Sequence, residues 1–328
     1  ALGETLTDFE GAAGSVLTPS GLAAITTALL SCLSAGDHLL MIDTTYHPTR
    51  HFCDGMLKRL GISTTYFDPL AGAGIEALIR PETKAIYLEA PGSLTFEMPD
   101  IPAIVAVAKA RDLVVLMDNT WATPLYFRPI DHGVDLSIMA GTKYVVGHSD
   151  VMIGTVAASV RAWKGLKAAH GDLGLCVGPD DVYLALRGLR TLDVRLERHR
   201  KSALEVAKWL QSRPEVARVL YPALPSDPGH AVWKRDFSGA SGLLSFVTRK
   251  APLSAVKAML DRLALFGLGY SWGGYESLAI VSDPRSTRTA TTWESEGHLV
   301  RLHIGLEDVG DLIADLDAGF ARFAAAAG

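Results

Sequence analysis

Short hydrophobic runs alternate with helical patterns through the first half of the chain. Runs of about four to eight apolar residues, bounded by polar or turn-forming residues, predict buried strands. These strands are His38–Thr45, Thr64–Phe67, Lys84–Glu89, Leu113–Asp118, Leu136–Met139 and Met152–Ala158. The helices predicted between them lie near Gly21–Leu33, Pro48–Leu60, Ile75–Ile79 and Ile101–Arg111. The alternation predicts an α/β fold around a mainly parallel sheet with helices on both faces.

A basic helical region, roughly Asp180–Ser212, separates this half from an α+β pattern. The later strands are expected near Ala217–Tyr221, Gly242–Val247 and Leu299–Ile304, and the later helices near Leu253–Leu263 and Val309–Phe323. We therefore expect a large domain over residues 1–195 and a smaller α+β domain over residues 196–328. Asp193 and Glu197 interleave the arginines of the basic region, which favours a solvated or intersubunit helix face. Those arginines are Arg187, Arg190, Arg195, Arg198 and Arg200.

Composition narrows the possible partners. The chain has 328 residues, of which 48% are hydrophobic and 20% charged, as in globular proteins. A net charge of −5 argues against nucleic acid or an anionic membrane as the main partner. No apolar run is long enough to cross a bilayer. The three cysteines form no CxxC pair and are expected to be reduced thiols, which favours a cytoplasmic location.

Three features beside the predicted strands can serve one cofactor. Asp118 ends one apolar strand, and Lys143 follows another, where burial would lower the pKa of its amine. The segment Thr18–Ala24 places small residues at a helix start, where free N–H groups can hold a phosphate. Singly these features are more simply a structural acid, a surface lysine and a capped helix. Together they match a cofactor with an aldehyde, a ring nitrogen and a phosphate.

The stretch Gly141–Gly154 resembles the lysine signature of the Cys/Met-metabolism family of pyridoxal-phosphate enzymes. Further segments resemble this family over essentially the whole chain: Leu88–Glu97, Arg187–Leu192, Trp233–Phe237, Tyr270–Ser277 and Arg301–Asp308. The resemblance implies a fold-type I architecture, with a seven-stranded type of sheet in the large domain. It also implies pyridoxal 5′-phosphate (PLP) as the cofactor and a homo-oligomer, a tetramer built from closely paired dimers.

The resemblance implies catalytic roles for Lys143 and Tyr46, and a cofactor-binding role for both and for Asp118. Lys143 would carry the cofactor aldehyde as a Schiff base and then move the substrate Cα proton to the leaving sulfur. Asp118 would keep the pyridine nitrogen protonated. Tyr46 would stack on the ring face, a contact worth about 1 kcal/mol.

The phosphate would be held by Gly21 and Leu22 through backbone N–H groups, and by Thr142. Relatives often carry a serine three residues before the lysine, where this chain has Ala140. They also carry an N-terminal segment with a Tyr-x-Arg motif that reaches the phosphate of a neighbouring subunit. The first ten residues already look like the middle of a helix, with Leu2, Leu6 and Phe9 on one face. We therefore expect that residues are missing upstream of Ala1, and that the phosphate site is incomplete without a segment of this kind.

The same resemblance implies a substrate pocket. Arg301 would bind the α-carboxylate of an amino acid in a bidentate fork, and Ser271 and Trp272 would line that pocket. Tyr183 is a further candidate, although a helix aromatic packed on the core explains it equally well. The implied reaction is a carbon–sulfur lyase reaction, the β-elimination of L-cystathionine, with cysteine or cystine as further substrates. Family members that act at the γ-carbon share this apparatus and remain alternatives.

Two other classes of protein, a serine hydrolase and a non-catalytic regulator, are alternatives to a lyase. Gly269–Gly273 matches the G-x-S-x-G nucleophile elbow around Ser271, and Asp283 with His298 or His303 follows in hydrolase order. An elbow needs a buried strand before it and a helix after it, and the flanking glycines favour neither. The other alternative is a regulator that binds the cofactor without catalysis, which intact Lys143 argues against. No metal site is expected.

Overall fold

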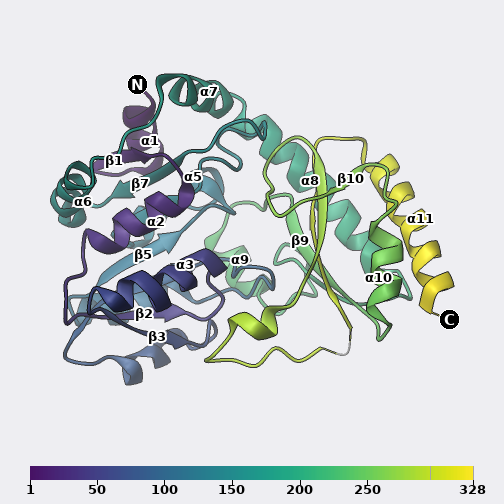
Figure 1. Ribbon diagram of the computed structural model, residues 1–328, viewed down its shortest axis with the longest axis horizontal. Helices are drawn as coiled ribbons and strands as arrows, with labels where there is room; N and C mark the ends of the chain where they lie inside the picture. The colour runs from purple at the N-terminus through teal and green to yellow at the C-terminus, as the bar shows by residue number, and fades with distance from the viewer. Residues whose placement is uncertain (296, 328) are drawn as a thin grey trace.

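The computed structural model describes residues 1–295 and 297–327, which form two β-sheets with helices packed around them (Figure 1). The strands are β1 (Gly14–Thr18), β2 (His38–Ile42), β3 (Ser63–Phe67), β4 (Thr83–Glu89), β5 (Val114–Asp118), β6 (Leu136–Met139), β7 (Gly154–Ala158), β8 (Val216–Leu220), β9 (Leu243–Thr248), β10 (Phe266–Leu268), β11 (Ser277–Ser282) and β12 (Leu299–His303). The α-helices are α1 (Leu2–Glu10), α2 (Gly21–Leu30), α3 (His47–Phe52), α4 (Ile101–Ala110), α5 (Thr123–Tyr126), α6 (Val160–Asp172), α7 (Pro179–Leu189), α8 (Leu192–Gln211), α9 (His230–Asp236), α10 (Leu253–Leu260) and α11 (Val309–Ala327). Shorter 3-10 or π helices cover Cys53–Leu57, Gly72–Leu78, Pro129–His132 and Pro284–Thr287.

The first sheet has seven strands in the order β1-β7-β6-β5-β4-β2-β3. Its strands run parallel except β7, which is antiparallel to both of its neighbours. This arrangement confirms the predicted fold class. Glu89 on β4 pairs with Asp118 on β5, and Asp118 pairs with Ile138 on β6. The carboxyl ends of the three central strands therefore meet at one edge, where open α/β sheets bind their ligands.

Both faces of this sheet are buried. Leu39 and Met41 of β2 pack in one hydrophobic cluster with α2, whereas Leu40 and Ile42 pack in another with α4. All four side chains are fully buried. Successive side chains of a strand point to opposite faces, so a strand covered on both sides is a continuous apolar run in the sequence.

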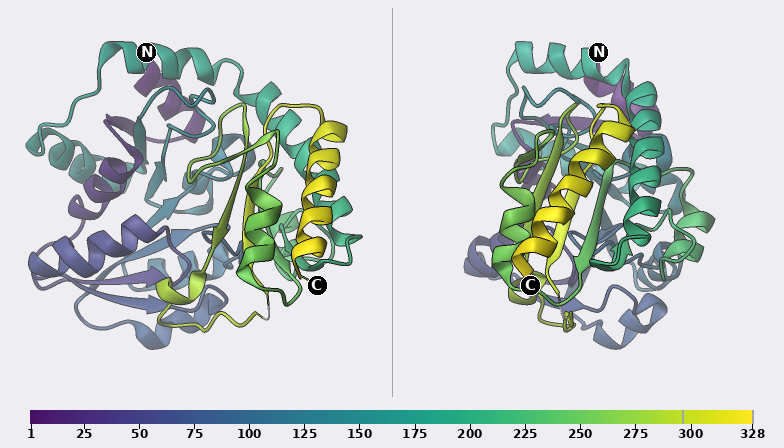
Figure 2. Two further views of the ribbon diagram at one scale, coloured as in Figure 1. Left: turned by 45° about the vertical axis from the view of Figure 1, so that its right-hand side comes forward. Right: turned by 90° about the vertical axis from the view of Figure 1, so that its right-hand side faces the viewer.

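The second sheet has five strands in the order β10-β11-β12-β9-β8, antiparallel except for the β10–β11 pair. Figure 2 shows α10 and α11 side by side against this sheet. The long helix α8 packs on β8, β9 and α11. We propose that the boundary between the domains lies near residue 195, close to the start of α8.

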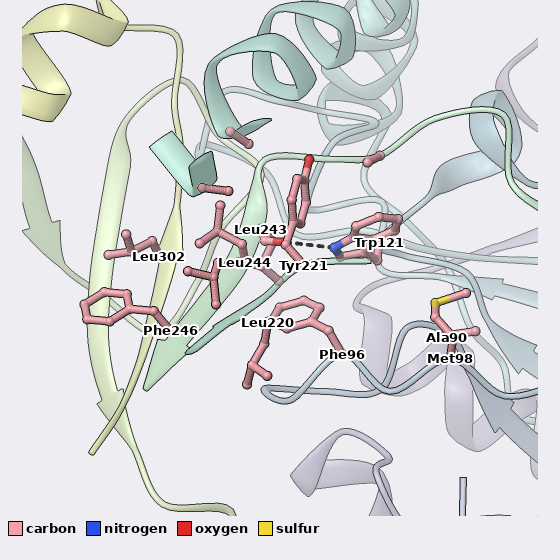
Figure 3. Close-up of a cluster of buried hydrophobic side chains, with 14 of the residues drawn as sticks. Ala90, Phe96, Met98, Trp121, Leu220, Tyr221, Leu243, Leu244, Phe246 and Leu302 are labelled. Atoms are coloured by element: carbon pink, nitrogen blue, oxygen red, sulfur yellow. Dashed lines mark hydrogen bonds between the residues drawn. The ribbon is translucent and has the colours of Figure 1, made fainter. Parts of the chain in front are cut away.

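A shared hydrophobic core joins the two sheets (Figure 3). Trp121, three residues after β5 ends, donates an indole N–H hydrogen bond to the Leu243 carbonyl of β9 at 3.0 Å. Its ring also makes edge contacts with Tyr221 and Phe237, at centroid distances of 6.4 and 6.5 Å. These contacts fix the end of β5, which carries Asp118, against the second domain.

Several elements differ from the sequence prediction. Strands β1, β10 and β11 were not predicted. Strand β1 is defined by pairing with the distant β7, and β10 has only three residues. The basic region forms two helices instead of one, α7 and α8. Their junction lies near Gly188, where a Cβ atom would lie only 2.6 Å from the Val145 carbonyl oxygen. This close contact between distant segments leaves no mark in the helical periodicity. None of the helices described is long and apolar enough to cross a membrane.

Candidate active site

Lys143 follows β6 at the carboxyl edge of the first sheet, and its amine reaches the second domain. Lys143 Nζ donates a hydrogen bond to Ser271 Oγ at 2.8 Å and lies 5.2 Å from the centre of the Trp272 ring. Burial and then the nearby Arg301 guanidinium lower the pKa of Lys143 to about 8, against the opposing effect of Asp118. Part of the Lys143 population is therefore uncharged near neutral pH, and the uncharged amine is the nucleophilic form.

Asp118 ends β5 and is 8% exposed. Its hydrogen bonds both end on Oδ1, from the Thr120 backbone N–H at 2.9 Å and from the Thr120 hydroxyl at 2.5 Å. Burial raises the pKa of the Asp118 carboxyl, while Thr120 and Lys143 act against that rise. Among the residues described, no donor reaches Oδ2. A cationic N–H placed there would satisfy the second oxygen of the carboxylate.

The start of α2 lies against the end of β6. Ser20 caps the helix and accepts a hydrogen bond from the Ala23 N–H at 3.1 Å. A Cβ atom on Gly21 would lie 2.6 Å from the Ala140 Cβ, so glycine is required for this close approach. The N–H groups of Gly21 and Leu22 belong to the first helical turn, where the backbone offers unpaired donors and a positive dipole end. This geometry suits a phosphate group beside Lys143.

Tyr46 immediately precedes helix α3, and its side chain is 46% exposed. Its backbone N–H donates to Glu89 Oε2 at 2.6 Å, and the Ser93 hydroxyl donates to Glu89 Oε1. Burial and then the charges of Asp118 and Glu89 raise the pKa of the Tyr46 phenol. Tyr46 is therefore neutral at physiological pH. The sequence does not predict that Glu89 anchors the Tyr46 backbone. Its position at the end of β4, beside Asp118, is the signal that could have indicated this role.

The segment Tyr270–Gly273 forms the wall opposite Lys143. Arg301, on β12, is 8% exposed and donates from Nη2 to the Tyr270 carbonyl at 2.7 Å. Burial lowers the pKa of the Arg301 guanidinium to about 10, which still leaves it charged. The structure thus places Ser271 and Trp272 beside the Lys143 amine, with the Arg301 guanidinium nearby. Their role in binding a substrate stays a prediction.

The positions of Thr142 and Tyr183 give less direct support to their predicted roles. The Thr142 hydroxyl donates to the Ile153 carbonyl at 3.1 Å and accepts from the Ile153 N–H at 2.9 Å. That hydroxyl would have to rotate away from Ile153 before it could donate to a phosphate. Tyr183, on α7, is 67% exposed, so it is not the buried core aromatic that was the alternative reading. Within the described part of the chain, Tyr183 makes no hydrogen bond with the pocket residues.

The hydrolase alternative is wrong. Ser271 Oγ is paired with Lys143, and Asp283 instead forms an ion pair with Arg285 at 2.7 Å. The imidazole of His298 contacts the Ala251 carbonyl, and that of His303 contacts the Gly273 N–H and the Glu276 carbonyl. The segment around Ser271 also connects strand β10 to strand β11 instead of leading into a helix. The serine, acid and base of a hydrolase are therefore not assembled.

Arg195 corrects another expectation from the sequence. This residue lies on α8 but is only 6% exposed, so it does not belong to a solvated helix face. Its guanidinium donates to the Tyr144 and Gly188 carbonyls, each at 2.8 Å. Arg195 thereby fixes the backbone immediately after Lys143. The alternation of charges along α8 does not indicate this role. A charge pattern reports which helix positions are polar, and it carries no information on the loop that packs against them.

A lysine of lowered pKa, a buried carboxylate with an open oxygen and a helix start converge at the carboxyl edge of the sheet. These groups fit the aldehyde, the ring nitrogen and the phosphate of PLP, respectively. Together with the α/β topology they define a PLP-dependent enzyme of fold type I.

Comparison with known proteins supports the same class. The model of the Cys/Met metabolism PLP-dependent enzyme family matches residues 1–321. The chain belongs to this family, which confirms the resemblance found in the sequence.

Individual relatives match over nearly the full chain. A protein of Rhizobium johnstonii is 57% identical over 99% of this chain and 83% of its own length. Cystathionine β-lyase of Escherichia coli K12 is 49% identical over 98% of this chain and 83% of its own length. Among solved structures, cystathionine γ-synthase of Xanthomonas oryzae, in complex with aminoacrylate and cysteine, superposes with a TM-score of 0.93 at 34% identity. That match covers 99% of this chain and 85% of the solved chain.

Proposed function

We propose that this chain is a cystathionine β-lyase, which converts L-cystathionine and water to homocysteine, pyruvate and ammonia. One observation carries the proposal: the Lys143 amine lies 2.8 Å from Ser271 Oγ, in a pocket that also presents the Arg301 guanidinium. Such a pocket places a proton carrier beside a binding site for an amino-acid carboxylate. The 49% identity to the E. coli β-lyase supports this choice within the family.

The residues described would hold PLP in a defined way. Lys143 would bind its aldehyde carbon, Asp118 Oδ2 would accept the ring N–H, and the Gly21 and Leu22 N–H groups would bind its phosphate. Tyr46 would cover one face of the ring. When bound, PLP supplies an electron sink that stabilises negative charge at the substrate Cα.

The protein contributes orientation and proton transfer. Arg301 would bind the substrate α-carboxylate and so fix the Cα–H bond relative to Lys143. With its amine free, Lys143 would take the Cα proton and deliver it to the departing sulfur. Its pKa of about 8 suits both roles, because the amine can bind and release a proton near neutral pH. Asp118 would contribute a negative charge at the ring nitrogen of the bound cofactor.

We further propose that the protein acts in the cytoplasm as a homo-oligomer, a tetramer of closely paired dimers. Light scattering coupled to size-exclusion chromatography measures this directly. A purified protein that remains monomeric at micromolar concentration would contradict the proposed assembly.

The products identify the reaction. With L-cystathionine as substrate, we expect homocysteine and pyruvate in equal amounts, because β-elimination leaves the β-carbon fragment as pyruvate. Elimination at the γ-carbon would instead yield cysteine and 2-oxobutyrate, and those products would show that the protein is a γ-lyase. Absence of turnover by the PLP-loaded protein would favour the non-catalytic regulator. Mass spectrometry of the keto acids separates these outcomes.

A further inference from the structure

His303 is a fully buried histidine on β12, two residues after Arg301 and therefore on the same face of that strand. Its Nε2 accepts a hydrogen bond from the Gly273 backbone N–H at 3.1 Å. Its Nδ1 faces the Glu276 carbonyl at 3.0 Å. A backbone N–H can only donate and a carbonyl can only accept, so the two partners select the neutral tautomer with its proton on Nδ1.

The segment Tyr270–Gly273 accepts or donates a hydrogen bond at three of its four residues. Arg301 binds the Tyr270 carbonyl, Lys143 binds the Ser271 hydroxyl, and His303 binds the Gly273 N–H. Trp272 lies between the last two contacts. The backbone is also close to Lys143, since a Cβ atom on Gly273 would lie 2.8 Å from the Lys143 Cα. A small movement of Gly273 would therefore change the space around the lysine amine.

We propose that His303 is a positioning residue for the amino-acid substrate: its neutral imidazole holds the Ser271–Trp272 wall against Lys143. The inference rests on the proposed lyase function, in which these two residues line the substrate pocket. His303 touches none of the reacting atoms, so its effect is on the shape of the pocket. Protonation at Nε2 would oppose the Gly273 N–H with a second donor and break this contact.

The surroundings of His303 keep its imidazole neutral. The ring packs against Tyr144 and against His199 of α8, at centroid distances of 5.9 and 5.2 Å. Burial, then His199 and the cations Arg301 and Lys143, hold the pKa of the His303 imidazole well below its ordinary value. The buried contact with Gly273 is therefore kept throughout the neutral pH range.

His199 provides a matched control. It is fully buried in the same ring cluster, but its Nδ1 donates to the Ile304 carbonyl at 2.7 Å. Within the described residues, His199 makes no hydrogen bond with the Tyr270–Gly273 segment. Replacing His199 by phenylalanine removes one buried hydrogen bond, and replacing His303 removes two, those with Gly273 and with the Glu276 carbonyl. Both substitutions keep a ring of similar shape. Only His303→Phe leaves the Gly273 N–H without its acceptor.

The test combines hydrogen exchange and kinetics on the PLP-loaded protein. We expect amide exchange in the peptide around residues 270–276 to accelerate at least about tenfold in His303→Phe, with little change in His199→Phe. We also expect His303→Phe to raise KM for L-cystathionine roughly tenfold to a hundredfold, with a smaller change in kcat. His303→Gln offers an amide oxygen to Gly273 and should restore much of the protection. His303→Met, of similar size but without that oxygen, should not, and this pair carries the test if His303→Phe does not fold.

Wild-type exchange and wild-type KM in His303→Phe or His303→Met would overturn the inference. Equal effects of His303→Phe and His199→Phe would also overturn it, because they would reduce His303 to core packing. The exchange measurement needs no turnover and is independent of the proposed function. If His303→Phe accelerates exchange as expected but the wild-type protein does not cleave cystathionine, only the lyase assignment is refuted.

Discussion

Replacing Gly273 by alanine tests how closely the substrate wall fits against Lys143. Gly273 has a φ angle of +88°, which strains any other residue by about 1–2 kcal/mol. The added Cβ would also lie 2.8 Å from the Lys143 Cα and 2.9 Å from both its Cβ and its carbonyl carbon. Backbone atoms cannot yield as the tip of a flexible side chain can, so the wall must move. We expect Gly273→Ala to lower kcat/KM for L-cystathionine by at least about tenfold, or roughly 1.4 kcal/mol.

Gly36→Ala is the matched control for this substitution. Gly36 has a similar φ angle of +94°, but a Cβ atom there would meet no atom within 4 Å. Urea unfolding should show that both variants lose about 1–2 kcal/mol of stability from backbone strain. Only Gly273→Ala should lose activity. Wild-type kcat/KM in Gly273→Ala, or an equal loss of activity in Gly36→Ala, would refute the close fit of the wall.

Two further predictions concern buried charges. Arg301→Lys should raise KM for L-cystathionine about tenfold to a hundredfold in steady-state kinetics, because an ammonium cannot form the planar fork; an unchanged KM would contradict carboxylate binding by Arg301. Glu10→Gln should become more stable than the wild type as pH rises. Glu10 is 1% exposed, and burial raises the pKa of its carboxyl to about 8, so the folded state keeps a proton that the unfolded chain releases near pH 4.5. Wild-type stability should therefore fall relative to Glu10→Gln between about pH 4.5 and 8 by about 1 kcal/mol or more per pH unit, and level off above; parallel urea-unfolding curves at pH 5 and pH 9 would disprove this.

The parts of the site that follow a buried strand were predictable from the sequence. Asp118 ends an apolar strand and Lys143 follows one by four residues, and parallel strands bring their carboxyl ends to the same edge of a sheet. Arg301 and Ser271 were placed through the family resemblance, because nothing in their local pattern indicates a carboxylate pocket. The structure then brought both into contact with the Lys143 region.

Contacts between distant segments could not be predicted. Arg195 looks like one more charged residue on a surface helix, yet it is buried against the carbonyl of Tyr144. His303 fits a hydrolase pattern in the sequence, and only the folded structure shows that its Nε2 accepts a hydrogen bond from the Gly273 N–H. In both cases the partner is a backbone group, and a backbone group carries no residue type for a sequence pattern to reveal.

The central claim is that Lys143 carries the cofactor and moves the substrate proton, and Lys143→Ala tests it most directly. The control is Lys167→Ala, on the exposed side of α6. After loading with PLP and gel filtration, we expect Lys143→Ala to lose the visible absorption of the lysine-bound cofactor. Its rate of pyruvate formation from L-cystathionine should fall at least about a thousandfold, while Lys167→Ala keeps both properties. A Lys143→Ala protein that retains the absorption, or forms pyruvate at the wild-type rate, would contradict the account.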